Sequence, residues 1–189
     1  IPLTLDEFNH LVQTLDEQEE YQMKLYVLLA YYTGARRSEC IQVLKEVASY
    51  EKVKDKDFYA SNTVRGKGAG KNGKPFKLYF NDIVMNAMKE YLEYRGEDDE
   101  PALFVRKFKD GRVEPLSREV FNDWCANKFS NILGIRVTPH NFRRTRATHM
   151  VVEEGLSIDK AKSLLNHNSS ETTSLYVIKE DGDELDDIF

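Results

Sequence analysis

The segment from residue 20 to residue 33 is the feature that most limits how this chain can fold. It is apolar on most faces at helical spacing, and Gly34 follows it directly. A helix that is hydrophobic all round is typical of a buried position, and glycine suits the turn that ends a helix. The sequence therefore predicts a buried central helix.

Capping residues and apolar periodicity predict further helices on both sides of this segment. Thr4 and Glu7 have the form of a capping box ahead of an apolar-periodic run. Thr138 and Pro139 supply an N-cap and a proline at the first helical position. We expect helices over about residues 4–15, 82–95, 117–133, 139–154 and 157–165, a helix carrying Cys40, Ile41 and Leu44 that opens near Arg37, and a final one capped by Ser170 that contains Tyr176.

The pattern changes between about residues 57 and 80 to Tyr, Thr, Val and Phe around four glycines, which predicts a β-hairpin with a long basic turn. A second short strand over residues 103–108 meets the turn signal Asp110-Gly111. The expected fold class is α+β, mainly α, with a small antiparallel sheet. At 189 residues the chain fits one globular domain.

No apolar stretch approaches the roughly 20 residues that span a bilayer, so we expect a cytoplasmic protein without a membrane partner. Cys40 and Cys125 lie in apolar-periodic segments without other ligands at metal spacing, which predicts buried, reduced thiols. Because the chain begins at Ile1 and not at a methionine, we expect it to be part of a longer protein.

The net charge of −5 lies entirely in residues 179–189, which hold six acidic residues and one lysine. The remainder is neutral and has two basic segments. A solvated face is the ordinary explanation for such charges, but clustered cations also attract a phosphate backbone. The basic residues are Arg65, Lys67, Lys71, Lys74 and Lys77 in the first segment, and Arg136, Arg143, Arg144 and Arg146 in the second.

Four segments hold polar groups that do not fit as cap, core or ordinary surface. An arginine follows the turn at Gly34, a lysine lies between two glycines in the hairpin, and a His-x-x-Arg pair opens a helix, where anions are attracted. A histidine and a tyrosine nine residues apart come last. The candidates are Arg36, Lys67, His140, Arg143, His167 and Tyr176.

In this order the motifs resemble those of the tyrosine recombinase family, also called phage integrases, over about residues 3–177. Residues 33–39 look like the first arginine box, 66–68 like the hairpin lysine motif, 138–145 like the second box, and 164–176 like the segment that leads to the nucleophile. The chain departs from the family at Arg144, where His is frequent, and at Asn166, where Gly is frequent. Further lysines in the hairpin leave Lys71 as an alternative to Lys67.

The resemblance implies a site-specific DNA recombinase that needs neither a metal nor a nucleotide cofactor. Tyr176 would attack a DNA phosphate and form a 3′-phosphotyrosine, with His140 as general base and Lys67 as general acid. Arg36 and Arg143 would bind the nonbridging oxygens, His167 would donate a hydrogen bond to the phosphate, and Glu39 would support the arginine box.

The resemblance also implies domains and partners. Residues 1–178 would form the catalytic domain, preceded by a DNA-binding domain, and four protomers would join two DNA duplexes, with a monomer when free of DNA. The acidic tail over residues 179–189 would dock on a neighbouring protomer or act as a solubilising segment. The alternatives are a type IB topoisomerase or hairpin-forming resolvase, a DNA-binding protein that has lost catalysis, and an unrelated helical enzyme.

Overall fold

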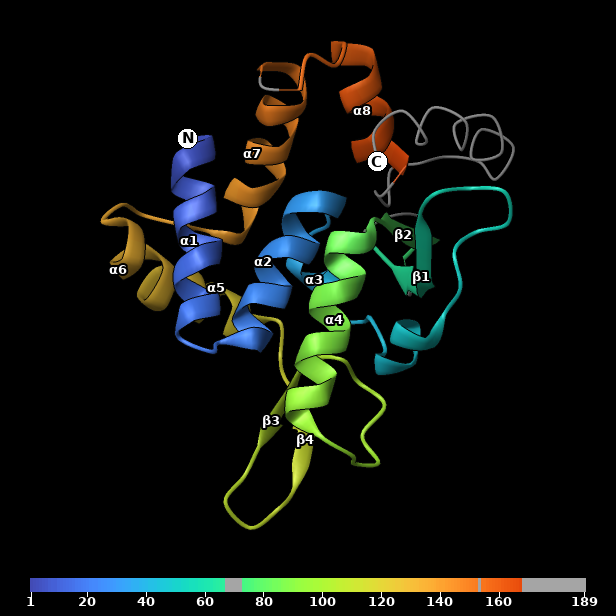
Figure 1. The fold of residues 1–189 in the computed structure, drawn as a ribbon, viewed down its shortest axis with the longest axis vertical. Helices are drawn as coiled ribbons and strands as arrows, with labels where there is room; N and C mark the ends of the chain where they lie inside the picture. Colours follow the sequence, from blue (N-terminus) through green and yellow to red (C-terminus); the bar gives the residue numbers. More distant parts are fainter. Residues whose placement is uncertain (67–72, 153, 168–189) are drawn as a thin grey trace.

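The computed structural model describes residues 1–66, 73–152 and 154–167, with the backbone alone for 164–167. It is mainly helical with two small antiparallel sheets, as predicted (Figure 1). The helices are α1 (Leu5–Glu17), α2 (Tyr21–Thr33), α3 (Arg37–Cys40), α4 (Asp82–Arg95), α5 (Glu119–Trp124), α6 (Ser130–Leu133), α7 (Pro139–Val152) and α8 (Ile158–His167), with a 3₁₀ turn over Lys45–Ser49 and a π turn over Cys125–Phe129. The strands are β1 (Tyr59–Arg65), β2 (Pro75–Phe80), β3 (Val105–Lys107) and β4 (Val113–Pro115).

Helix α2 is the predicted central helix. It packs against α1, α4 and α7, and its residues from Leu25 to Tyr31 are buried without interruption (Figure 1). The Tyr26 ring stacks on Phe121 of α5 with 4.0 Å between ring centroids. Gly34 ends the helix with a φ of 68°, a left-handed conformation that glycine adopts without strain.

Local signals set most helix boundaries where they were expected. The capping box at the start of α1 is present, with Thr4 Oγ1 accepting from Glu7 N and Glu7 Oε1 accepting from Thr4 N. The predicted bounds of α4 are correct at both ends. Cys40 and Cys125 are buried free thiols, and burial raises the pKa of both well above the usual range.

The two sheets are antiparallel hairpins. Strands β1 and β2 pair from Tyr59 opposite Phe80 to Arg65 opposite Pro75, with a bulge between Ala60 and Thr63. The predicted basic turn at residues 67–72 lies outside the described residues. Strands β3 and β4 form the second hairpin around the expected Asp110-Gly111 turn.

The helix predicted to open near Arg37 is a single turn, so the expectation that it would carry Ile41 and Leu44 is wrong. The backbone after Cys40 bonds instead to a distant segment. The Val43 carbonyl accepts from Leu103 N at 3.1 Å, and Lys45 N donates to the Pro101 carbonyl at 2.9 Å. These contacts occupy groups that a longer helix would need.

The helix predicted over residues 117–133 exists as α5, the π turn and α6 in succession, ended by Gly134 with a φ of 67°. The cap position is Arg118, so the prediction that Ser117 caps this helix is wrong. At the start of α6 the Ser130 hydroxyl donates to the Cys125 carbonyl at 2.6 Å and accepts from Val137 N at 2.9 Å. These bonds tie the end of the π turn to the segment that leads into α7.

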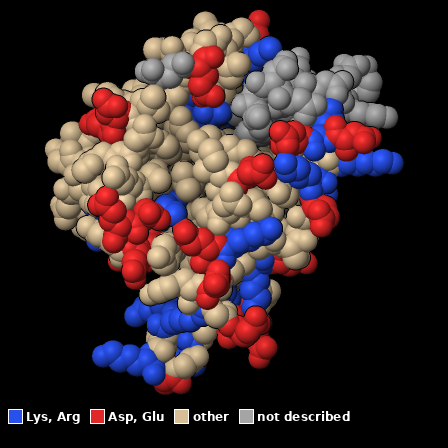
Figure 2. All heavy atoms as spheres, in the orientation of Figure 1, with Lys and Arg blue, Asp and Glu red and all other residues tan. Residues whose placement is uncertain are grey.

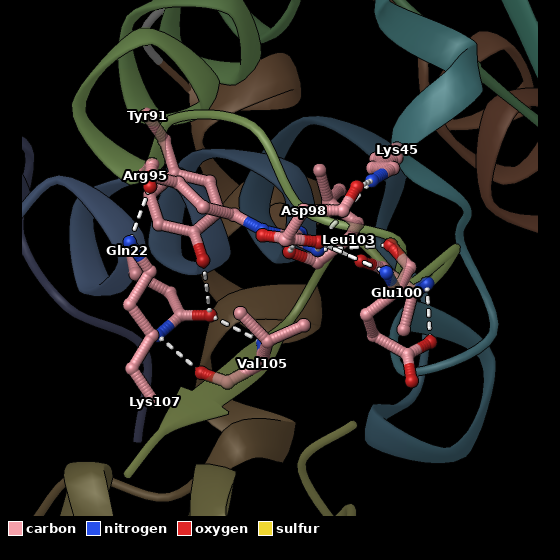
Figure 3. A network of polar contacts seen from close by, with 10 residues as sticks. Gln22, Lys45, Tyr91, Arg95, Asp98, Glu100, Leu103, Val105 and Lys107 are labelled. Carbon is pink, nitrogen blue, oxygen red and sulfur yellow. Dashed lines mark hydrogen bonds and ion pairs between the residues drawn. The ribbon is translucent and has the colours of Figure 1, made fainter. Parts of the chain in front are cut away.

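A polar network joins the C-terminal end of α4 to the β3–β4 hairpin (Figure 3). Arg95 donates to both carboxylate oxygens of Asp98, at 2.7 and 2.6 Å, and to the backbone carbonyls of the loop that follows. Gln22 of α2 donates to the Val105 carbonyl at 3.1 Å and accepts from Val105 N at 2.8 Å. The network fixes the hairpin to the central helix.

Acidic and basic side chains are interspersed over the face seen in Figure 2, and basic residues gather over the β3–β4 hairpin at its lower end. The described basic residues of that hairpin are Arg106, Lys107, Lys109 and Arg112. Within the described part of the chain, no helix has the length and apolar character that crossing a membrane requires.

Candidate active site

Arg36 is held at the junction between α2 and α3. Thr33 Oγ1 accepts from Ala35 N at 3.1 Å, which tightens the turn after the left-handed Gly34. Arg36 N donates to Glu39 Oε1 at 2.8 Å, and Arg36 Nη1 lies 3.7 Å from Glu39 Oε2. One carboxylate therefore accepts a hydrogen bond from the Arg36 backbone and also attracts its guanidinium group by charge, which favours one direction for Arg36 as it leaves the turn.

Glu39 has a fully buried side chain, unusual for an acid. Burial raises the pKa of its carboxyl group above the ordinary value, while the backbone bond from Arg36 and the charges of Arg36 and Arg143 oppose that rise. The two arginines therefore stabilise a carboxylate that would otherwise be costly to bury. This geometry agrees with the supporting role expected for Glu39.

His140 and Arg143 lie in the first turns of α7, as predicted from their spacing. The Asn141 side chain caps this end of the helix, since its Oδ1 accepts from Thr138 N at 2.6 Å. Arg143 Nη1 donates to the Gly34 carbonyl at 2.7 Å, across 109 positions of sequence. This bond joins the start of α7 directly to the turn that presents Arg36.

Arg36, His140 and Arg143 meet in one pocket with a volume of about 270 Å³. The pocket is partly open to solvent and lies between the α2–α3 turn, α5 and the start of α7. Two cationic forks and an imidazole facing a common space suit an anionic ligand such as a phosphate. The lining residues are Ala35, Arg36, Arg37, Asn122, Thr138, Pro139, His140 and Arg143.

The pKa of His140 is lowered from its ordinary value. Partial burial is the largest cause, followed by the positive charges of Arg144, Arg143 and Arg36. A histidine with an ordinary pKa of about 6.5 is already mostly neutral at pH 7, and this shift makes it more so. The ring is thus in the state that can accept a proton.

Three predicted site residues fall wholly or partly outside the described structure. Lys67, its alternative Lys71, and Tyr176 lie outside the described residues. His167 is the last residue of α8, and its backbone alone is described. Helix α8 starts as predicted, with Ser157 Oγ accepting from Lys160 N at 3.1 Å.

Helix α8 is packed against the body of the domain. Its Ala161 forms a buried apolar cluster with Met150 of α7 and Phe58, which precedes β1. This contact links the helix that ends at His167 to the helix that carries His140 and Arg143.

The structure corrects one part of the predicted basic surface and adds one residue to the pocket. Arg146 is buried, with its guanidinium over the rings of Tyr31 and Tyr32 and paired with Glu154 at 2.5 Å, so it does not belong to an exposed cluster. Asn122 lines the pocket and accepts from Arg37 Nη1 at 2.9 Å. No motif marks Asn122, because it reaches the site from a distant helix.

Comparison with known proteins decides the family. The pattern of the phage integrase family matches residues 2–182. The chain belongs to this family. The fold and the family expected from the arginine boxes are both confirmed.

Relatives of this integrase-family chain include bacterial and archaeal recombinases. It is 27% identical over 191 residues to the SPbeta prophage-derived recombinase-like protein YomM of Bacillus subtilis, covering all of the chain and 56% of YomM. It is 33% identical over 174 residues to the tyrosine recombinase XerA of Pyrococcus furiosus, covering 92% of the chain and 56% of XerA. The chain thus spans about half the length of these relatives.

Solved structures show the same fold for this family member. A crystal structure of XerA recombinase superposes with a TM-score of 0.65 at 22% identity, covering 95% of this chain and 63% of that one. The XerH site-specific recombinase bound to its difH substrate, in a pre-cleavage complex, gives a TM-score of 0.63 at 19% identity, covering 90% and 48%.

Proposed function

We propose that this chain is the catalytic domain of a site-specific recombinase that cuts and rejoins DNA through a 3′-phosphotyrosine at Tyr176. The observation that carries the proposal is the meeting of Arg36, His140 and Arg143, from two distant segments, around one pocket of about 270 Å³. Membership of the phage integrase family supports it.

In the proposed reaction the Oη atom of Tyr176 bonds to phosphorus while its proton passes to the imidazole of His140. The bond from phosphorus to the 5′ oxygen breaks, and Lys67 delivers a proton to that oxygen. Lys71 remains the alternative proton donor. The released 5′ hydroxyl of another strand reverses these steps, so the exchange needs no external energy source.

Arg36 and Arg143 stabilise the negative charge on the nonbridging oxygens. Both guanidinium groups have a partner before DNA binds, Arg36 in its ion pair with Glu39 and Arg143 in its hydrogen bond to the Gly34 carbonyl. Preorganised charge of this kind is usually the largest contribution to catalysis. His167 supplies a further hydrogen bond to the phosphate.

The proposed chemistry is carried by side chains, without a metal or a cofactor. Among the described residues no three His, Cys, Asp or Glu side chains gather in a group that could hold a metal ion. In the proposed site the two arginines take the charge-neutralising role that metal ions play in other phosphoryl-transfer enzymes.

The proposed partners are double-stranded DNA and further copies of the same protein. XerH in the related structure is bound to its difH substrate, and we extend DNA binding to this chain. Four protomers would hold two duplexes, residues 1–178 would form the catalytic domain, and the 179–189 tail would dock on a neighbour. A DNA-binding domain upstream and a cytoplasmic, nucleoid-associated location complete the proposal.

Trapping a covalent adduct tests the function. The substrates are overlapping nicked duplexes that together cover the DNA flanking the gene. On the duplex that contains the cleavage site, cleavage releases a short strand end at the nick. The strand cannot then be rejoined, so the covalent adduct accumulates. We expect a DNA-linked protein band from the wild type and none from Tyr176→Phe, with DNA affinity retained. Tyr94→Phe is the matched control, because Tyr94 is exposed and lies away from the pocket.

An adduct that survives in Tyr176→Phe would remove the nucleophile assignment. A wild-type protein that binds these duplexes but never forms an adduct would refute the proposed enzymatic activity. Joining of two separate duplexes, rather than relaxation of a supercoil, distinguishes a recombinase from a topoisomerase.

A further inference from the structure

The backbone of residues 1–3 lies along one face of α7 and is hydrogen bonded to three of its side chains. Asn141 Nδ2 donates to the Ile1 carbonyl at 2.8 Å, and Leu3 N donates to Thr145 Oγ1 at 2.9 Å. His149 Nε2 lies 3.0 Å from the Leu3 carbonyl. Asn141, Thr145 and His149 recur every four residues, so they form one row on the helix, here called the α7 ladder.

The α7 ladder is buried. Thr145 is 0%, His149 2% and Asn141 8% exposed, and the Leu3 side chain lies in the hydrophobic core. Buried donors and acceptors that lose their partners are not rescued by water, so the buried bonds of Thr145 and His149 to Leu3 resist exchange, while the bond of Asn141 to Ile1 is partly buried. The ladder therefore holds the segment and α7 in a single register.

The first residue of the ladder adjoins the pocket without lining it. Asn141 lies between His140 and Arg143 in sequence, and its Oδ1 also accepts from Thr138 N and Thr138 Oγ1, at 2.6 and 3.0 Å. Thr138 lines the pocket. One amide thus joins Ile1 to the helical turn that presents both proposed catalytic side chains.

The last residue of the ladder connects α7 to the central helix. Because the Leu3 carbonyl can only accept, Nε2 of His149 donates to it, and Nδ1 of the same ring lies within hydrogen-bond distance of the Tyr31 hydroxyl, at 2.7 Å. Tyr31 belongs to α2, whose end presents Arg36 and whose Gly34 carbonyl binds Arg143. Two contacts therefore join the α2 segment to α7, one between Tyr31 and His149 and one between the Gly34 carbonyl and Arg143.

We propose that Asn141, Thr145 and His149 are positioning residues, which hold His140 and Arg143 in line with Arg36 by fixing α7 against residues 1–3 and α2. The inference rests on the proposed function for the roles of those three site residues. Reacting groups tolerate little misplacement, since a shift of about 1 Å can lower a rate by about a hundredfold. Loosening the ladder would thus slow strand cleavage more than it weakens DNA binding.

Thr145→Val tests the inference. Valine has nearly the shape of threonine but cannot accept the Leu3 N–H bond, whereas Thr145→Ser keeps the hydroxyl. Thr148→Val makes the same replacement at a half-buried position of the same helix, which forms no hydrogen bond with residues 1–3 in the described part of the chain. Comparison of the three variants separates the effect of losing the bond from Leu3 N from the effect of changing the side chain.

The first measurement is the rate of covalent adduct formation at saturating DNA, together with DNA affinity and the melting temperature. We expect Thr145→Val to cleave about tenfold more slowly with DNA affinity changed less than about twofold. Thr145→Ser should restore most of the rate, and Thr148→Val should match the wild type. Equal rates in Thr145→Val and the wild type, or a loss that follows the unfolded fraction alone, would overturn the inference.

The second measurement does not depend on catalysis. The chain has four histidines, so NMR can follow the titration of His140 directly. We expect Thr145→Val to raise the pKa of His140 toward its ordinary value, because a loosened ring is less buried and also moves away from the arginine charges. An unchanged His140 titration in Thr145→Val would refute the positioning role. If the wild type forms no adduct but Thr145→Val shifts the pKa of His140, the proposed function is wrong while the positioning role of the α7 ladder is supported.

Discussion

Replacing Asp98 by alanine should destabilise the domain strongly through the network in Figure 3. The Arg95 side chain is 1% exposed, and the Asp98 carboxylate is its acidic partner, with bonds of 2.6 and 2.7 Å. Lys45 Nζ lies 3.2 Å from the same carboxylate. Asp98→Ala would leave a buried guanidinium without a counter-charge.

The magnitude follows from that burial. Removing one partner of a buried ion pair typically costs about 3–5 kcal/mol, a large part of the roughly 5–15 kcal/mol that stabilises a domain. Arg95 keeps the carbonyls of Glu100 and Ala102, at 2.9 and 2.7 Å, which favours the lower end of that range. At about 2–4 °C per kcal/mol for a domain of this size, the melting temperature should fall by about 6–12 °C.

Thermal and urea unfolding followed by circular dichroism measure this change. Asp99→Ala is the matched control, because the neighbouring Asp99 is exposed and outside the network. A fall in melting temperature below about 2 °C for Asp98→Ala, or an equal fall for Asp99→Ala, would refute the reasoning.

The pH dependence of stability provides a second test of the ion pair between Arg95 and Asp98. The hydrogen bonds from Arg95 hold the pKa of Asp98 well below its ordinary value. A carboxyl group with a depressed folded pKa stabilises the protein fully above its unfolded pKa of about 3.9 and loses that contribution as the pH falls below it. The wild type should therefore lose stability below about pH 4 more steeply than Asp98→Ala.

Two further predictions concern catalysis. Arg144→Ala should raise the pKa of His140, since among the charges that lower this pKa Arg144 has the largest effect. The acid limb of the pH profile of kcat/KM for adduct formation should therefore move to higher pH. Arg136→Ala removes an equal charge that is not among those acting on His140 and should leave the profile in place; identical profiles for all three proteins would contradict the assignment. Lys67→Ala should cleave a 5′-phosphorothiolate substrate at close to the wild-type rate, because sulfur leaves without a proton. Rescue of Lys71→Ala in its place would transfer the role of general acid to Lys71.

Local sequence was enough to predict features that depend on neighbouring residues. The capping box of Thr4 and Glu7, the end of α2 at Gly34 and the start of α7 at Pro139 all lie where the pattern indicated. Caps and turns are set by bonds that span only a few positions, so they can be read from the chain. The arginine boxes were identified through their resemblance to the motifs of the tyrosine recombinase family.

Two predictions failed because the deciding partners lie far away in sequence. The helix after Arg37 is a single turn, and the backbone that follows it bonds to a distant segment, with Lys45 N donating to the Pro101 carbonyl. Arg146 was assigned to a basic surface, yet it is buried against Tyr31 and Tyr32. Neither partner lies close enough in sequence for a pattern to reveal it.

The sequence by itself determined the candidate residues Arg36, His140 and Arg143 and the family to which the chain belongs. Only the tertiary structure decided how those residues are held. The bond from Arg143 to the Gly34 carbonyl spans 109 positions, and the link between His149 and Tyr31 spans 118. Such contacts form only when α7 packs on α2, and that packing depends on the whole hydrophobic core.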